Sequence, residues 1–416
     1  MRRYESYKDS GVEWLGEVPS HWESFPLFVQ AKISSITNHI DKELLSVYLD
    51  RGVVRFSDVD EKRTNVTSLD LSKYQLVRKG NLVLNNQQAW RGSVGVSSYE
   101  GIVSPAYLIL ELSNKFDPHY ANYLFRNSSM VSHYLIASKG VGTIQRNLYW
   151  GNLRRTPIFI PPLSEQQKIS QFLDDKTSKI DQAVDLAEKQ IALLKEHKQI
   201  LIQNAVTRGL NPDVPLKDSS VEWIGQVPEH WEVKKLKFVL TLSNKKEESK
   251  NSNKRYIGME NIESFTGKIN DIPLIAEGIA NSFYKDEILF GKLRPYLAKS
   301  YLADFDGICS TEFLVYRSTK VLNNRFALNI FLSYGFIDAV NASTYGSKMP
   351  RANAEFISNM FLAIPPLSKQ KQIIDYLDTQ TAKIDQAIAL KTAHIEKLKE
   401  YKSVLINDVV TGKVRV

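Results

Sequence analysis

Four short segments of this 416-residue chain gather the side chains that could read nucleic acid. Two of them are "NNQQAWRGS", residues 85–93, and "GTIQRNL", residues 142–148. The other two are "GKLRPYLAK", residues 291–299, and "GSKMPRAN", residues 346–353. Asn and Gln amides can form two hydrogen bonds with adenine, while Arg and Lys can bind guanine or phosphate. A single such side chain is often a solvated turn residue, but the clustering indicates a surface that contacts double-stranded DNA.

The candidate DNA-binding residues in the first two segments are Asn85, Asn86, Gln87, Gln88, Trp90, Arg91, Gln145, Arg146 and Asn147. Those in the other two segments are Lys292, Arg294, Tyr296, Lys299, Lys348 and Arg351. Trp90 aligns with Tyr296, and the two rings either stack on bases or pack inside the domain. The apolar pair Val83-Leu84 likewise matches Leu289-Phe290, although the loops that follow differ in chemistry. We therefore expect two sites of related geometry and different specificity.

The matching reflects a repeat that extends over much of the chain. "VEWLGEVPSHWE", residues 12–23, returns as "VEWIGQVPEHWE", residues 221–232, with nine of twelve letters identical. "IPPLSEQQKISQFLDDKTSKIDQAV", from residue 160, returns as "IPPLSKQKQIIDYLDTQTAKIDQAI", from residue 364. Two copies of about 205 residues indicate a tandem duplication, not a solenoid.

The repeated segment of residues 12–23 and 221–232, called the tryptophan phrase below, is interpreted as a structural clasp. It is expected to fix the start of each domain against a helix. Its packing anchors are Trp14, Trp22, Trp223 and Trp231. His21 and His230 lack a companion cluster of His or Cys at ligand spacing, so we expect no metal site.

The second repeated segment predicts a long helix in each copy. Pro161-Pro162 prevents a helix upstream, Ser164 is the expected N-cap, and Gln167 completes a capping-box pattern. Apolar residues then recur in heptads, which is typical of a coiled coil. The main apolar line contains Leu173, Ile180, Ala187, Leu194 and Leu201 in the first copy, and Leu377, Ile384, Leu398 and Leu405 in the second. Roughly 44 residues would form a rod of about 65 Å.

Lysines interrupt the apolar seam. Lys198 and Lys402 occupy the same heptad position, and Lys391 lies on the seam once more. These residues either fix the register or extend their ammonium groups from the seam into water. The two helices are expected to pair antiparallel within one chain, with pairing between two chains as the alternative.

The fold class that follows is α+β, with strand-rich segments such as "GNLVLNN", "DEILFG" and "GICSTEFLVYRS". We predict two tandem-duplicated α/β recognition domains separated by two long helices packed as an antiparallel coiled coil. The predicted boundaries are 1–159 for the first domain, 160–210 for the first helical region, 211–363 for the second domain and 364–416 for the second helical region.

Composition sets the remaining limits. There are 54 basic and 46 acidic residues, giving a net charge of +8, which slightly favours an anionic partner. Cys309 is the only cysteine, which excludes an internal disulfide and fits a reducing cytosol. The N-terminal "MRRYESYKDSG" lacks an apolar run, and no window resembles a membrane span. We therefore expect a cytoplasmic protein.

With these motifs in view, the chain resembles the specificity (S) subunit of type I restriction–modification systems, a phage-defence family. The resemblance rests on "YKDSGVEWLGEVPSHWE", "IPPLSEQQKI", "GVGTIQRNL" and "ILFGKLRPYL" and spans essentially the whole chain. It implies two target recognition domains, each reading half of a bipartite DNA site of three to five base pairs per half. It also implies helices that set the spacer and dock two methyltransferase (M) subunits, with endonuclease-translocase (R) subunits completing the complex.

The resemblance implies a subunit without catalytic activity, and the sequence contains no catalytic motif that contradicts this expectation. The sequence lacks an Asn-Pro-Pro-aromatic motif, a glycine-rich loop suited to S-adenosylmethionine and a G-x-x-x-x-G-K-[ST] loop. We therefore expect no cofactor on this chain, with S-adenosylmethionine, ATP and Mg²⁺ on the partner subunits. Three alternatives remain: an enzyme with an unrecognised site, a coiled-coil adaptor that does not bind DNA, and a family member that serves methylation alone.

Overall fold

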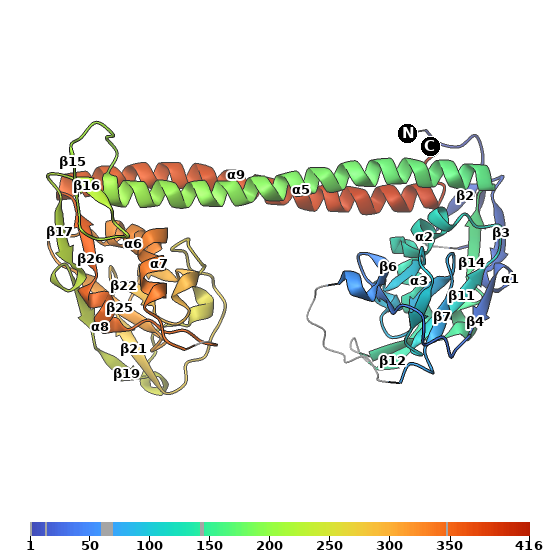
Figure 1. Ribbon diagram of the computed structural model, residues 1–416, viewed down its shortest axis with the longest axis horizontal. Coiled ribbons are helices and arrows are strands. Elements are labelled where there is room, and N and C mark those ends of the chain that lie inside the picture. The colour runs from blue at the N-terminus through green and yellow to red at the C-terminus, as the bar shows by residue number, and fades with distance from the viewer. Residues whose placement is uncertain (1, 13–14, 60–69, 142–144, 347) are drawn as a thin grey trace. The chain divides into compact units, whose positions relative to one another are not determined.

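The computed structural model describes residues 2–12, 15–59, 70–141, 145–346 and 348–416. Its helices and strands are shown in Figure 1. The chain divides into a first compact unit, residues 1–186 and 393–416, and a second unit, residues 187–392. These units divide both long helices, so they do not test the predicted boundaries, which stay a prediction. Trp14, one of the expected packing anchors, lies outside the described residues.

The first unit is built on a four-stranded antiparallel sheet. Its strand order is β4 (Ala31–Ser34), β11 (Tyr107–Leu112), β8 (Leu82–Asn85) and β9 (Val94–Val96). Helices α2 (Pro118–Arg126) and α3 (Ser128–Ala137) pack beside it, and Asp117 caps α2 by accepting from the Tyr120 N–H at 2.9 Å. Smaller pairs join β5 (Leu45–Tyr48) to β6 (Gly52–Arg55), β7 (Gln75–Val77) to β10 (Gly101–Val103), and β3 (Glu23–Pro26) to β14 (Pro157–Ile160).

The second unit repeats this arrangement. Its main sheet has the order β18 (Leu240–Ser243), β25 (Phe313–Ser318), β22 (Ile288–Gly291) and β23 (Ser300–Leu302). The accompanying helices are α6 (Asn324–Leu332) and α7 (Tyr334–Ala342), and β17 (Glu232–Lys235) pairs with β26 (Phe361–Ile364). A second sheet follows the order β19 (Lys246–Glu248), β21 (Ile279–Phe283), β24 (Gly307–Cys309) and β20 (Tyr256–Ile257). The shared strand order confirms the duplicated α+β fold and the strands predicted from "GNLVLNN", "DEILFG" and "GICSTEFLVYRS".

Both predicted long helices are present, as α5 (Leu163–Arg208) and α9 (Leu367–Val410). In the second unit Lys198 Nζ donates to Asp385 Oδ1 at 2.6 Å, and Lys391 Nζ donates to Gln190 Oε1 at 2.5 Å. Position 190 of α5 therefore lies beside 391 of α9, and position 198 lies beside 385, so the residue numbers rise along one helix as they fall along the other. The helices run antiparallel within the chain, as predicted.

The same pairing occurs in the first unit, where Lys402 Nζ lies 2.7 Å from Asp181 Oδ1. Asp181 and Asp385 hold the same place in the two copies of "KIDQA", so the two ion pairs are related by the repeat. Each seam lysine reaches across to the opposite helix. This geometry supports the interpretation that the lysines fix the register, because one register places both ammonium groups beside a carboxylate.

The predicted N-cap at Ser164 is wrong. Helix α5 begins at Leu163, and the N–H groups of Glu165 and Gln166 donate to the Pro162 carbonyl at 2.9 and 3.0 Å. The equivalent Ser368 also lies inside its helix, since α9 begins at Leu367. The prolines, which lack an N–H, supply the first helical carbonyl, so a serine cap is not required.

A buried glutamine in the first turn joins each long helix to its domain. Gln166 accepts from the Asp117 N–H at 2.8 Å and donates to the carbonyls of Lys115, at 2.8 Å, and Pro161, at 2.9 Å. Gln370 repeats the pattern with Asn323 N–H, Val321 O and Pro365 O. Both side chains are fully buried, and each carboxamide satisfies three backbone groups.

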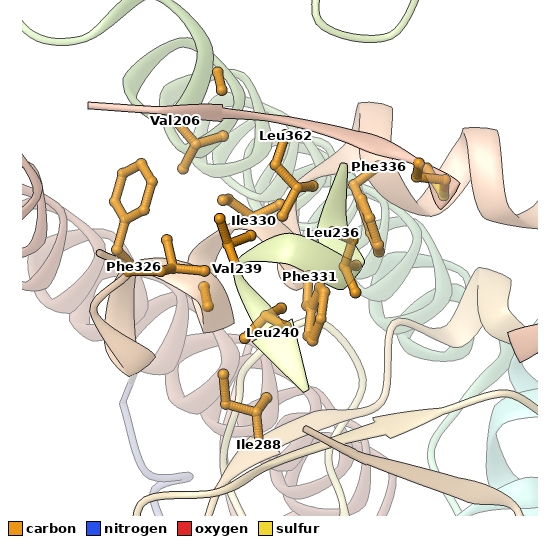
Figure 2. Close-up of a cluster of buried hydrophobic side chains, with 14 of the residues drawn as sticks. Val206, Leu236, Val239, Leu240, Ile288, Phe326, Ile330, Phe331, Phe336 and Leu362 are labelled. Carbon is orange, nitrogen blue, oxygen red and sulfur yellow. The ribbon is translucent and has the colours of Figure 1, made fainter. Parts of the chain in front are cut away.

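The long helices also contribute to the hydrophobic cores. Figure 2 shows Val206, from α5, beside Phe326 and Leu362 in the core of the second unit. In the first unit, Leu173 of α5 and Val409 of α9 belong to one buried cluster with Trp22. Because these helix residues lose their apolar surface to the domain core, each helix end is fixed to its own domain.

The tryptophan phrase forms the predicted clasp. Trp22 is buried, and its Nε1–H donates to Glu165 of α5 at 3.3 Å, while Gln203 of α5 donates to the Trp223 carbonyl at 3.1 Å. His21 pairs with Glu165 at 2.8 Å. In the described ranges, no three His, Cys, Asp or Glu side chains gather as a metal site requires. Over the same ranges, no helix is long and apolar enough to cross a membrane.

Candidate nucleic-acid interface

The first candidate loop leaves the middle of the main sheet in the first unit. Strand β8 ends at Asn85, and its residues Leu82, Val83 and Leu84 are fully buried, which gives the loop a rigid base. A short 3₁₀ helix, η2 (Ala89–Arg91), forms the tip of the loop. Gly92 then takes a φ of 103°, which glycine adopts without steric cost, and returns the chain to β9.

In the second candidate segment of this unit, residues 142–144 lie outside the described residues, and the rest forms β13 (Gln145–Leu148), which pairs antiparallel with β12 (Ser138–Val141). The two segments meet through one backbone hydrogen bond, in which the Leu148 N–H donates to the Asn86 carbonyl at 2.9 Å. The structure therefore brings together residues 85–91 and 146–147, which lie more than fifty positions apart in the sequence. The side chain of Gln145 lies outside the described residues.

In the second unit, an equivalent backbone hydrogen bond joins the two candidate loops. The loop after β22 contains the 3₁₀ helix η6 (Pro295–Leu297), and the Ala352 N–H donates to the Lys292 carbonyl at 2.9 Å. Lys292 stands where Asn86 stands in the first unit, and Ala352 where Leu148 stands. The Arg294 N–H adds a bond of 2.7 Å to the Pro350 carbonyl. Both units thus present one loop pair, held by matching backbone bonds and bearing different side chains.

In the first unit, part of the predicted set shapes the loop itself. Asn85 Oδ1 accepts from the Gln87 N–H at 3.1 Å, and Trp90 donates its indole N–H to the Gln87 carbonyl at 2.9 Å. The Arg91 guanidinium stacks 4.8 Å from the centre of the Trp90 ring. Gln87, Arg91 and Asn147 are exposed, and Trp90 is half-buried, so the loop holds this side chain while part of it stays accessible.

In the second unit, two predicted cations already have partners inside the domain. Arg351 donates to both carboxylate oxygens of Glu312, at 3.0 to 3.2 Å, and this hydrogen bonding raises the pKa of the guanidinium. Lys299 Nζ donates to the Met259 carbonyl at 2.6 Å. Lys348 and Tyr296 are exposed. The fold thus separates Arg351 and Lys299, which tie their own segments to the rest of the domain, from Lys348, which is exposed.

Three exposed side chains beside the loops were missed by the sequence reasoning. Tyr149 follows β13 in the first unit, and Lys139 Nζ lies 5.8 Å from the centre of its ring. In the second unit, Tyr345 and Met349 are 65% and 49% exposed next to Lys348. The sequence did contain a signal for them: they are large apolar residues in predicted turns, where small or polar residues are usual. Exposed aromatic rings beside cations suit base stacking.

Comparisons with known proteins show the family of this chain. Residues 36–196 and 228–400 each match the type I restriction modification DNA specificity domain. The MjaVIII type I restriction enzyme specificity subunit of Methanocaldococcus jannaschii is 24% identical to this chain, over 96% of this chain and 94% of its own length.

Two solved structures share the fold. One, from a study of the complex assembly and conformational transition of the type I R-M system, has a TM-score of 0.71 and 15% identity, and covers 95% of this chain and 99% of its own. The HsdS subunit from Thermoanaerobacter tengcongensis has a TM-score of 0.54 and 16% identity. The match covers 95% of this chain and 98% of that subunit. The two family matches lie one in each repeat and together span most of the sequence. This chain belongs to the type I restriction–modification DNA specificity family, as a non-catalytic DNA-recognition subunit.

Proposed function

We propose that each recognition domain reads one half of a bipartite, interrupted DNA site. The observation that carries the proposal is the duplicated loop pair, in which the Asn86–Leu148 and Lys292–Ala352 backbone bonds are equivalent while the side chains around them differ. A shared scaffold gives both domains the same approach to a duplex, and different side chains give each its own preference. The candidate contacts are the residues predicted from the sequence, from Asn85 to Asn147 and from Lys292 to Arg351.

The chemistry of each loop pair supports direct readout of DNA. In the first unit the pair presents Gln87, Gln88 and Asn147, whose amides suit adenine, next to Arg91. In the second unit it presents Lys292 and Lys348, which suit guanine or phosphate. An overall charge of +8 favours the approach of a polyanion.

The two long helices are proposed to set the spacer and to dock two methyltransferase (M) subunits, with endonuclease-translocase (R) subunits completing the assembly. Exposed apolar side chains on the helices of the second unit support a docking role. Leu193 and Leu390 are 63% and 66% exposed, and Ile200 is also exposed. Apolar groups left in water on a paired helix are typical of a surface that a partner covers.

The catalytic cofactors are assigned to the partners. S-adenosylmethionine, ATP and Mg²⁺ would bind to the M and R subunits, and this chain would supply recognition alone. A complex that acts on DNA together with its methyltransferase would reside in the cytoplasm, and the buried free thiol of Cys309 suits that reducing compartment.

Selection from a randomised duplex library tests this function. The chain would be purified in complex with its methyltransferase, and the bound DNA would be sequenced. We expect two blocks of three to five base pairs separated by a fixed gap. Replacing residues 85–93 with Gly and Ser, while keeping Asn86 and Gly92, should change one block only. A single continuous block, or a change in both blocks, would contradict the proposal.

A further inference from the structure

Arg294 has an unusual backbone in the loop of the second domain. Its φ is 49° and its ψ is 60°, a left-handed conformation that residues with a side chain seldom adopt and that stores strain. Two hydrogen bonds and a following proline hold it there. Its N–H donates to the Pro350 carbonyl at 2.7 Å, its carbonyl accepts from the Leu297 N–H at 2.9 Å, and Pro295 follows it directly. Strain that is held by neighbouring bonds is characteristic of a functional position.

The side chain of Arg294 also differs from the other cations of its loop pair. Within the described residues, its buried Nε has no hydrogen-bond partner, and no carboxylate lies within ion-pair distance of its guanidinium. Arg351, by contrast, is bonded to Glu312, and Lys299 to the Met259 carbonyl. Buried donors are nearly always satisfied in folded proteins, so the unpaired Nε marks a guanidinium that the domain itself does not engage. The residue is half-buried, and the terminal nitrogens, which also have no partner among the described residues, are the ones that can meet an acceptor on a ligand.

We propose that Arg294 is the residue with which the second domain recognises a guanine, an inference that rests on the DNA-reading function proposed above. The guanidinium is planar, and two of its N–H groups can donate together to the O6 and N7 acceptors of guanine in the major groove. Arg351 and Lys299 act as positioning residues, because their bonds to Glu312 and to the Met259 carbonyl tie the two segments beside it to the domain.

The first domain places Gln88 at the matching position, directly before the 3₁₀ helix η2 as Arg294 stands directly before η6. Gln88 is half-buried, and across the described residues no hydrogen bond involves its amide group. An amide at this place suits adenine, whereas a guanidinium suits guanine. One loop position thus carries a base-specific side chain in both domains, with the base changed by substitution.

The test uses the complex of the full chain with its methyltransferase and a duplex that contains its selected sequence. Each guanine in turn is replaced by 7-deazaguanine, which lacks the N7 acceptor. At one guanine in the half read by the second domain, affinity should fall about 10- to 150-fold, which corresponds to the loss of one hydrogen bond from a charged donor. Arg294→Gln should abolish this sensitivity and change the selected base at that position alone. Arg325→Gln, an exposed arginine on α6 that pairs with Asp378, is the matched control and should keep the selected sequence.

The outcomes separate the inference from the function on which it rests. If the wild-type complex selects no interrupted sequence, the bipartite function itself fails. If it selects one, but that half contains no guanine or no 7-deazaguanine lowers affinity, the assignment of Arg294 is overturned, even where the variant does not fold. A folded Arg294→Gln complex that selects the wild-type sequence overturns it as well.

Discussion

Gln166 offers a direct test of how the recognition domain is attached to the long helix. Gln166→Met keeps a side chain of similar length and volume, so no cavity forms, but it removes the carboxamide. The substitution would leave the Asp117 N–H and the Lys115 and Pro161 carbonyls without their side-chain partner. The adjacent Gln167 is exposed, and Gln167→Met is therefore the matched control.

The expected loss follows from the three bonds. Leaving one buried polar backbone group unsatisfied costs about 1–3 kcal/mol. Two of the three bonds are only partly buried, so the low end of that range applies, and the three groups together give about 3 kcal/mol. The control should change the free energy of unfolding by at most about 0.5 kcal/mol, as is usual for surface sites.

A urea titration read by pulsed hydrogen–deuterium exchange can follow each unit separately, which matters because a chain with two units need not unfold in one step. Peptides from residues 107–135 report on the first unit, and peptides from residues 313–342 on the second. Gln166→Met should lower the midpoint of the first set and Gln370→Met that of the second. A loss below about 1 kcal/mol, or an equal loss in Gln167→Met, would refute the view that these glutamines anchor the domains.

Three further predictions concern other parts of the chain. Burial raises the pKa of Cys309 from 9.0 to about 12, so iodoacetamide at pH 8.5 should modify the thiol only after unfolding. Because the unfolded thiol ionises first, this group should also make the fold less stable as the pH rises from 9 to 12. Asp385→Asn should lower the free energy of unfolding of the second unit, from a urea titration, by about 1–3 kcal/mol, since the ammonium of Lys198 is nearly buried. Asp181→Asn should cost below about 1 kcal/mol, because its pair with Lys402 is more exposed. Lys292→Gln should weaken DNA binding at every sequence alike and reduce the slope of log affinity against log salt by about 0.9, measured by fluorescence titration.

Each of these predictions has an outcome that would count against it. Alkylation of Cys309 in the native chain would show that the thiol is accessible. Equal losses for Asp385→Asn and Asp181→Asn would mean that burial of the lysine does not govern these pairs. An unchanged salt slope for Lys292→Gln would remove this lysine from the phosphate contacts, and a changed sequence preference would make it a base contact.

The sequence predicted the larger elements because their signals are repetitive. Heptads that begin near Leu173 and Leu377 can be satisfied only by helices with an apolar seam, and α5 and α9 follow them. Strands β8 and β22 were visible as short apolar runs beside glycine. The duplication gave two independent views of each element, so a signal that is weak in one copy was supported by the other.

The side-chain bonds could not be predicted in the same way. Glu312 and Arg351 lie thirty-nine positions apart, and only the folded sheet brings their charges together. Gln166 was visible as a repeated letter, but a glutamine in the first turn of a helix gives no sign that it is buried. Arg294 did carry a signal, because the residue before a proline is disfavoured in the right-handed helical region. That signal excludes a helix without revealing a left-handed backbone.

The most direct test of two-domain recognition is single-molecule sequencing of DNA from cells that express the chain with its methyltransferase. We predict an interrupted motif with modified adenines, in which exchanging residues 85–93 alters one half and exchanging residues 291–299 alters the other. A motif that is continuous, or one in which both exchanges alter the same half, would contradict it.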